Sequence, residues 1–301
     1  MEAVLTKALS FLAMIAAGIL LRRIGLFKDG DDRILSKIIL NFTLPAAVVG
    51  AFSNFRVDVS LIALVGLGVL MNLLLSGAGY FLARKGSKAD KAFGLLNYSG
   101  YNIGSFTMPY VQSFLGDAGM AITGLFDTGN ALMCTGGTYA IASAMMGEER
   151  PSLPSMAKKV FSSVPFDSYL VMFLVSLSGF RLPQVVLTVC GNIASANAFL
   201  CMFMVGLMFK IELKGNLGRV LSIVGLRFLL NCLVATLFYF CLPFDEEIRR
   251  VLVIASFSPI SAMAPVFSMM LGLDKGTAGA ANSLSIPLAI ATITGLLVLW
   301  H

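Results

Sequence analysis

The sequence AFGLLNYSGYNIGSFTMP, residues 92–109, lies inside an apolar run that is long enough to cross a membrane. It places Asn97, Asn102, Gly100, Gly104 and Pro109 near the middle of that run. Proline removes a backbone donor and glycine weakens a helix, so the segment is predicted not to stay continuously helical. Peptide groups freed at this depth need partners other than lipid, such as substrate or ions, and half-helix N-termini favour anions.

A second segment of the same kind, SFSPISAMAP, occupies residues 256–265 and carries two prolines and three serines. The two segments are related by a weak repeat at an offset of 156 residues, in which Asn41–Pro45 corresponds to Asn197–Cys201. In the same register Val49-Gly50 falls on Val205-Gly206, Pro109 on Pro265 and Gly116 on Gly272, with Asp117 and Asp274 just beyond. Chance similarity among common membrane residues is the alternative. Matching span boundaries favour a true repeat, and both halves are predicted to break at one place.

The composition favours a membrane protein over a soluble one. Of 301 residues, 57% are hydrophobic and 13% are charged, whereas an average soluble domain has about 25% charged residues. Apolar runs near the bilayer-spanning length of about 20 residues recur along the chain, at about 3–21, 34–52, 61–82, 92–115, 120–146, 167–180, 185–209, 218–241, 250–271 and 277–300. The sequence therefore predicts an all-α membrane protein of ten transmembrane helices. An odd number of spans in each half inverts the second half relative to the first, so the prediction is a five-plus-five inverted repeat: residues 1–146, a linker at 147–166, and residues 167–301.

Basic residues predict the orientation of the spans. The loops after spans 1, 3, 5, 7 and 9 contain 15 Lys and Arg residues, against four in the loops after spans 2, 4, 6 and 8. The positive-inside rule then places the 147–166 linker in the cytoplasm and both termini outside. The first run is interpreted as a retained span, because it begins with Glu2 and ends in Arg22-Arg23 rather than a small-residue cleavage site.

Several function classes have little support. The net charge of +6 arises from loop residues rather than one basic face, so no nucleic-acid partner is predicted. The five cysteines lie in apolar segments without metal-ligand spacing, and the only histidine is His301. Neither a metal centre nor a Ser-His relay can be assembled from these residues. We expect no cofactor, no metal and no enzymatic activity.

Two ionisable residues, Asp127 and Arg227, lie inside predicted spans. Charge within a membrane is a functional-site hypothesis by default, and either residue is a candidate for coupling or anion pairing. Arg227 lies near the cytoplasmic end of its span, where a long side chain can snorkel outward instead. Asp127 is too short to snorkel well, which leaves polar packing as its alternative role.

These residues resemble the auxin efflux carrier family of membrane transporters, including its bacterial members, over essentially the whole chain. The resemblance rests on GILLRRIGLF at 18–27, the Asn41–Pro45 segment, Asn102-x-Gly104 with Pro109, and Pro259 with Leu271–Asp274. Two departures concern the pocket: no proline precedes Gly206 in span 7, and Thr107 replaces a frequent glycine.

The resemblance implies that broken helices 4 and 9 cross near the substrate site, and that one bundle rocks against a scaffold to move organic anions by alternating access. Family substrates include auxin and dicarboxylates such as malonate or malate. Carried over by position, the substrate-binding residues are Asn102, Gly104, Ser105, Pro109, Ser258, Pro259, Ser261 and Pro265, with Asn41 and Pro45 lining or bracing the pocket.

The sequence therefore predicts a secondary transporter of a small organic anion (a mono- or dicarboxylate or an auxin-like acid) in the cytoplasmic membrane. Candidate partners are that anion, the lipid bilayer, H⁺ or Na⁺ as a coupling ion, and a second copy in a homodimer. Two alternatives stay open: a sodium-coupled symporter of the bile-acid-carrier type, and a membrane scaffold or receptor without transport.

Overall fold

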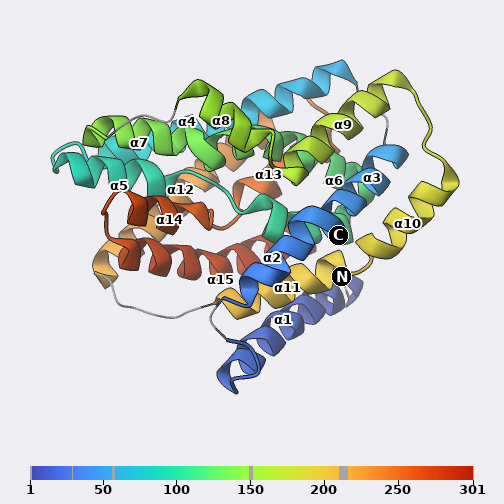
Figure 1. Ribbon diagram of the computed structural model, residues 1–301, viewed down its shortest axis with the longest axis horizontal. Coiled ribbons are helices and arrows are strands. Elements are labelled where there is room, and N and C mark those ends of the chain that lie inside the picture. Colours follow the sequence, from blue (N-terminus) through green and yellow to red (C-terminus); the bar gives the residue numbers. More distant parts are fainter. Residues whose placement is uncertain (1, 29, 56–57, 149–151, 210–215, 301) are drawn as a thin grey trace.

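The computed structural model describes residues 2–28, 30–55, 58–148, 152–209 and 216–300, and these ranges contain helices and no strand (Figure 1). The first part of the chain forms α1 (Glu2–Arg23), α2 (Asp32–Ile38), η1 (Ile39–Thr43), α3 (Leu44–Asn54), η2 (Val59–Ile62), α4 (Ala63–Leu82), α5 (Lys88–Tyr98), η3 (Ile103–Thr107), α6 (Met108–Leu132), η4 (Met133–Gly137) and α7 (Thr138–Met146). The remainder forms α8 (Leu153–Val160), α9 (Val164–Ser178), α10 (Gln184–Ala194), α11 (Asn197–Met208), α12 (Leu217–Cys241), α13 (Glu246–Ser256), α14 (Met263–Met270) and α15 (Lys275–Leu299).

Six helical stretches of the described chain are long and apolar enough to cross a membrane. They are Leu5–Arg23, Asp32–Asn54, Val59–Leu82, Gln184–Met208, Leu217–Cys241 and Lys275–Leu299, which match predicted spans 1, 2, 3, 7, 8 and 10. Predicted spans 4 and 9 are each divided into shorter helices, span 5 is spread over α6, η4 and α7, and span 6 corresponds to the 15-residue α9. Large apolar side chains such as Leu229, Leu233 and Phe240 are exposed on these helices. The chain is therefore a multi-pass helical membrane protein.

The interruptions predicted from the first and second polar segments are present, but they do not lie at Pro109 or Pro265. The chain leaves helical geometry at residues 99–102, after α5, and at 257–262, after α13. Pro109 is in the first turn of α6 and Pro265 is in the first turn of α14. In α14 a missing N–H costs little, because the first-turn donors of a helix have no intrahelical acceptor. Pro109 instead follows the π-helical η3, in which the Met108 N–H bonds to the Ile103 carbonyl.

Two glycines at the predicted repeat offset share an unusual backbone conformation. Gly116, inside α6, has φ 66° and ψ −157°, so the helix is kinked there between the segments assigned to spans 4 and 5. Gly272 follows α14 with φ 64°. Positive φ is readily accessible only to glycine, so the matched residues Gly116 and Gly272 allow the chain to turn at corresponding points.

The helices pack as two groups, which contact each other chiefly through α3 and α6. The first bundle contains α1, α2, α3, α9, α10 and α11, and the second bundle contains α4–α7 and α12–α15. Within each bundle, glycines allow close helix contact: an added Cβ at Gly18 would collide with the α11 backbone, and one at Gly68 with the α6 backbone. Helix pairs in lipid commonly associate through such small residues.

The basic segments lie mainly toward one end of the bundles. Helices α5, α12 and α15 begin toward the left of Figure 1, whereas α3 ends and α10 begins toward the right. Four of the loop residues counted for the orientation, Arg56, Arg150, Lys210 and Lys214, lie outside the described residues.

Candidate functional site

The two interruptions contact each other through their backbones. The N–H of Asn102 donates to the carbonyl of Pro259 at 2.9 Å, and the N–H of Ser261 donates to the carbonyl of Gly100 at 3.3 Å. Between them, Tyr101 and Ile260 form an isolated antiparallel bridge. Two segments about 160 residues apart in sequence therefore meet in opposite directions inside the second bundle.

Asparagine side chains hold the peptide groups of the first interruption. The side-chain oxygen of Asn72, on α4, accepts from the Gly100 N–H at 2.8 Å. Asn130, on α6, accepts from the Tyr101 N–H at 3.1 Å and donates to the Tyr101 carbonyl at 3.0 Å. Because both side chains are buried, the freed peptide groups find partners within the protein rather than requiring a ligand.

The second interruption is held in a similar way. The Ile260 N–H donates to the Ser285 hydroxyl at 3.0 Å, and the Asn282 amide donates to the Ile260 carbonyl at 2.6 Å, both from α15. Tyr101 and Ile260 are bridge partners, and each has its N–H and its carbonyl bonded to polar side chains of a later helix. The two halves of the crossing thus have corresponding supports, Asn130 in α6 and the Asn282–Ser285 pair in α15.

Arg227 supports the first interruption from α12. It is 3% exposed, so it does not snorkel to the surface. Its guanidinium donates to the carbonyls of Tyr98 and Gly100, the latter at 2.6 Å, and stacks 4.7 Å from the centre of the Tyr101 ring. The Tyr98 carbonyl is at the end of α5, where helical carbonyls have no intrahelical donor, and the Gly100 carbonyl belongs to the interruption that follows.

Asp127 connects the crossing to the first bundle. One carboxylate oxygen accepts from the Asn130 amide at 2.8 Å, and the other accepts from the Tyr169 hydroxyl of α9 at 3.3 Å. The carboxylate also faces the chain after the first interruption, because a Cβ added at Gly104 would lie 3.6 Å from it. A buried acid therefore lies where the two bundles meet.

The residues predicted for substrate binding have different environments. Asn102, Gly104 and Ser105 are half-buried in or just after the first interruption. Within the described part of the chain, the side chains of Asn102 and Ser105 make no hydrogen bond, which leaves them available to a ligand. Pro109 is buried in α6.

In the second segment, Ser258 and Ser261 are buried, and the Ser258 and Thr107 hydroxyls are 2.6 Å apart, so they join the two interruptions. Pro259 accepts the Asn102 N–H, and Pro265 lines a cavity. Asn41 is exposed and bonds to Lys37 on its own helix.

In the second predicted span, Asn41 and Pro45 were expected to line or brace the pocket, but the buried polar contact comes from Thr43. The Thr43 hydroxyl, rather than Asn41, donates to Asn197 of α11 at 2.9 Å. Pro45 is half-buried in the first turn of α3. Asn41 is therefore not brought together with the crossing.

Sequence reasoning did not identify Asn72, Asn130, Asn282 or Ser285 as supports of the interruptions. The available signal was the presence of amide side chains in apolar spans, where polar groups need partners. Which backbone group each amide would bond depended on long-range packing that no local pattern shows.

A cavity of about 870 Å³ lies beside the second interruption, along α14 and α15. Pro265 and Asn282 line its inner part, and Met208, at the end of α11, contributes the side that belongs to the first bundle. Asp274 and Lys275 are at its mouth. Hydrogen bonds from Thr277 hold the pKa of Asp274 below its usual value, so its charge persists beside Lys275.

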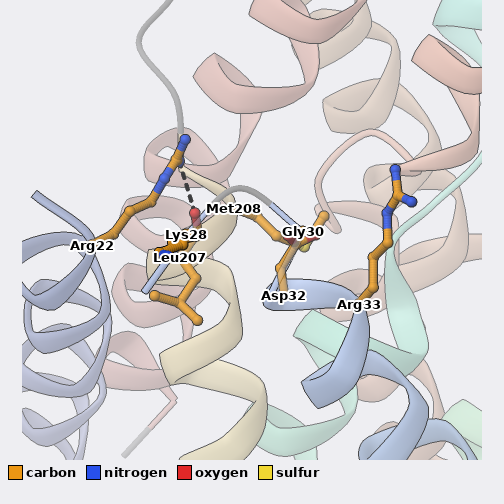
Figure 2. A pocket seen from close by; sticks show the side chains of 7 residues that line it. All are labelled: Arg22, Lys28, Gly30, Asp32, Arg33, Leu207 and Met208. Atoms are coloured by element: carbon orange, nitrogen blue, oxygen red, sulfur yellow. Dashed lines mark hydrogen bonds between the residues drawn. The ribbon is translucent and has the colours of Figure 1, made fainter. Parts of the chain in front are cut away.

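Figure 2 shows a neighbouring pocket of about 370 Å³, which Met208 also lines. Three cationic side chains, Arg22, Lys28 and Arg33, surround it together with Asp32. The Arg22 guanidinium donates to the Leu207 carbonyl at 2.8 Å and so joins α1 to the end of α11. Two neighbouring pockets, which share Met208 and are lined by four cationic and two acidic residues, therefore lie at the basic end of the protein.

At the opposite end the bundles are in contact. The Asn54 amide, at the end of α3, donates to Asp117 of α6 at 2.7 Å. Lys7 of α1 donates to the Ser113 carbonyl at 2.6 Å. Next to these polar contacts, the aromatic rings of Phe11 of α1 and Tyr110 of α6 pack edge to face. Polar and aromatic contacts thus join the two bundles at this end.

Comparison with known proteins gives one distant relative and no family assignment. No protein-family model matches the chain. An uncharacterized transporter of Methanothermobacter thermautotrophicus is 25% identical over 293 residues, which cover 95% of this chain and 94% of the relative. The similarity extends over nearly the whole of both chains. It supports a transporter in general and favours a protein that is not an enzyme.

Proposed function

We propose that the protein is a secondary transporter that moves a small organic anion, a mono- or dicarboxylate or an auxin-like acid, by alternating access. The observation that carries this proposal is the meeting of two interrupted helices at residues 99–102 and 257–262. Non-helical backbone within a membrane is tolerated where it is buried in protein or lines a cavity, and transporters commonly place their substrate sites there.

The proposed architecture is ten spans in two inverted halves, residues 1–146 and 167–301, joined by the 147–166 linker. Helix pairings support it: α4 packs on α5 and α6, and α12 packs on α13 and α15. Likewise α1 packs on α11, and α9 packs on α3. The antiparallel bridge between Tyr101 and Ile260 agrees with halves of opposite topology. By the positive-inside rule, the linker and the basic end face the cytoplasm and both termini face outside.

The first bundle is the proposed scaffold and the second bundle the moving part. In this conformation the cavity along α14 and α15 opens at the basic end, and the contacts at Asn54 and Lys7 close the other end. With the proposed orientation, the conformation is open to the cytoplasm. The cationic side chains around the mouth favour entry of an anion.

The anion is proposed to bind at the crossing, where Asn102 and Ser105 offer side-chain donors that the described protein groups leave free. Helices α6 and α14 begin just beyond the two interruptions, and their N-terminal ends favour negative charge. Asp127 is the proposed coupling residue. Its bond to Tyr169 joins the two bundles, so gain or loss of a proton changes that contact.

The test is the thermal stability of detergent-purified protein against mono- and dicarboxylates and indole acids, with and without Na⁺ and across pH. A ligand that binds only the folded state raises Tm. We expect at least one anion to raise Tm in the wild type and to lose this effect in Asn102→Ala. Asn192→Ala, an exposed asparagine of α10, is the matched control and should respond like the wild type.

Other outcomes separate the alternatives. A shift that requires Na⁺ would favour the sodium-coupled symporter. Stabilisation by cations or neutral solutes alone would overturn the organic-anion assignment. An equal rise in Tm in Asn102→Ala would show that the ligand does not bind at the crossing. No change in Tm with any anion would favour the non-transporting scaffold or receptor.

A further inference from the structure

Arg227 is a buried cation whose charge no carboxylate balances within the described residues. The ion pairs found there are Arg219–Asp90 and Arg250–Glu246. Arginine stays protonated in proteins, and an unpaired charge at this depth is costly unless other groups stabilise it. The groups in contact with the Arg227 guanidinium are the carbonyls of Tyr98 and Gly100 and the face of the Tyr101 ring.

These partners are the kind that stabilise a cation. Tyr98 is the last residue of α5, and the carbonyl end of a helix carries partial negative charge. The face of an aromatic ring is also negative. Carbonyl oxygens gathered at the end of an interrupted helix are typical ligands of a coupling Na⁺ in transporters. Here the guanidinium of the protein occupies that position.

The space next to Arg227 leaves little room for a second cation. The adjoining cavity has a volume of only about 20 Å³, and its lining includes Arg227, Asn231, Ser258 and Ser285. That is enough for about one water molecule. A metal ion there would also be repelled by the guanidinium at close range.

A neutral side chain of the first half also holds this interruption. Asn72 lies on α4, next to the residue that the 156-residue offset matches to Arg227, and accepts from the Gly100 N–H. The same interruption is therefore held by a neutral amide on one side and by a cation on the other. The cation, Arg227, contacts the carbonyl oxygens at the end of α5, whereas the neutral Asn72 contacts an N–H group.

We propose that the Arg227 guanidinium is a built-in cation of the crossing, which takes the place of a bound alkali ion by neutralising the carbonyl end of α5. The crossing then keeps its shape without a bound metal ion. We therefore expect the stability of the substrate-free protein not to depend on Na⁺ or K⁺. The inference rests on the geometry of the crossing, so it does not depend on which substrate is carried.

The test compares thermal unfolding of substrate-free protein in NaCl, KCl and N-methylglucamine chloride at about 150 mM, where long-range charge effects are equally screened. Wild-type Tm should be the same in all three salts. Arg227→Ala should lower Tm by roughly 5 °C or more. About 10 mM guanidinium, far below denaturing concentrations, should restore part of that loss by refilling the vacated position.

Arg219→Ala, which removes a partly exposed ion pair on the same helix, is the matched control and should not respond to guanidinium. Specific stabilisation of the wild type by Na⁺ would overturn the proposal. So would an Arg227→Ala protein that is as stable as the wild type, or one that guanidinium does not stabilise.

Arg227→Lys carries the test if the alanine variant does not fold. An ammonium group is a point charge that cannot reproduce the planar guanidinium fork, so we expect a Tm below that of the wild type and independent of Na⁺. A lysine variant that Na⁺ stabilises specifically would contradict the proposal. All of these measurements are made without substrate, so they are distinguishable from a failure of the organic-anion assignment.

Discussion

At the scale of single residues, amide side chains determine whether the crossing holds together. Asn130 bonds both backbone groups of Tyr101 and one oxygen of Asp127. One side chain thus supports the interruption and orients the buried acid. In water, the backbone groups of Tyr101 could bond to solvent instead of to Asn130, but within a membrane no alternative partner is available.

Replacing Asn130 by alanine should therefore be costly. The change leaves the Tyr101 N–H and carbonyl buried without their side-chain partner, and each unsatisfied group costs about 1–3 kcal/mol. We expect a clear decrease in Tm in detergent, whereas Asn192→Ala on the exposed face of α10 should change little. An Asn130→Ala protein as stable as the control would show that the asparagine does not support the interruption.

Replacing Asp127 by asparagine tests its proposed role in coupling. The side chain keeps its size and its ability to accept from Tyr169, but it can no longer gain or lose a proton. If Asp127 couples proton movement to transport, the anion-induced rise in Tm should depend on pH in the wild type and become independent of pH in Asp127→Asn. Ligand titrations between about pH 5 and 8 measure this dependence. Equal pH profiles for the wild type and Asp127→Asn would show that Asp127 does not take part in coupling.

At the scale of helices, close contacts between glycines set the spacing within each bundle. An added Cβ at Gly68 of α4 would collide with the backbone of α6 near Phe126 and Asn130, whereas one at Gly66 would meet nothing within 4 Å. These two positions on one helix form a matched pair.

Gly68→Ala should consequently destabilise the protein by about 1–3 kcal/mol, the usual cost of overpacking. Gly66→Ala should leave stability unchanged or slightly higher, because alanine restricts the unfolded chain. Thermal unfolding of the two variants distinguishes them. Equal Tm values would mean that α4 and α6 are not in close contact at Gly68.

The start of α5 carries a pH-dependent contribution to stability. The Ser87 hydroxyl and N–H, followed by Arg219, hold the pKa of Asp90 below its usual value. A lowered carboxylate pKa stabilises the folded state above the unfolded pKa of about 4, and this stability is lost as the pH falls through the folded value. The Asp90 and Arg219 side chains are 42% and 37% exposed, so solvent screening keeps the effect small.

Asp90→Asn should lower stability at pH 7 by about 0.5 kcal/mol, and the difference from the wild type should disappear in acid. Glu247→Gln, at the exposed start of α13, is the control. A difference that persists below the folded pKa of Asp90 would show that its charge is not the cause.

The apolar runs predicted the helical, membrane-spanning character of the chain and approximate positions for six long helices. The two polar segments were correctly predicted to interrupt their helices, but not at which residues. Pro259 lies within the second interruption, whereas Pro109 and Pro265 follow the interruptions, near the starts of α6 and α14. The repeat offset correctly matched the positive-φ Gly116 and Gly272. Asn41 and Asn197, which the same offset matches, have different environments: Asn41 is exposed, whereas Asn197 is buried and accepts from Thr43.

Contacts at the crossing were less predictable. Local sequence indicated polar residues near Gly100, but the partners come from α4, α6, α12 and α15, and their pairing depends on how the whole bundle packs. Arg227 illustrates the difficulty: its sequence depth allowed an outward snorkel, whereas the fold directs it to the carbonyl end of α5.

At the scale of the whole molecule, contacts join the two bundles at one end, and the cavity along α14 and α15 lies at the other. A further cavity of about 600 Å³ at the contact end is lined by α3, α9 and α10 of the first bundle. The mouth of the cavity along α14 and α15 and the pocket next to it carry Arg22, Lys28, Arg33 and Lys275. Such an asymmetric arrangement suits a transporter in one of its two end states. Movement of the second bundle against the first would open the Asn54–Asp117 contact and close the cavity.

The most direct test of this account is uptake of labelled malonate, malate and indole-3-acetate into vesicles that contain the purified protein. We predict uptake above that of protein-free vesicles for at least one of these organic anions. Asn102→Ala should reduce this uptake about tenfold or more, the loss of one hydrogen bond to a charged ligand, and Asn192→Ala should not. No uptake of any anion, or undiminished uptake by Asn102→Ala, would contradict the account.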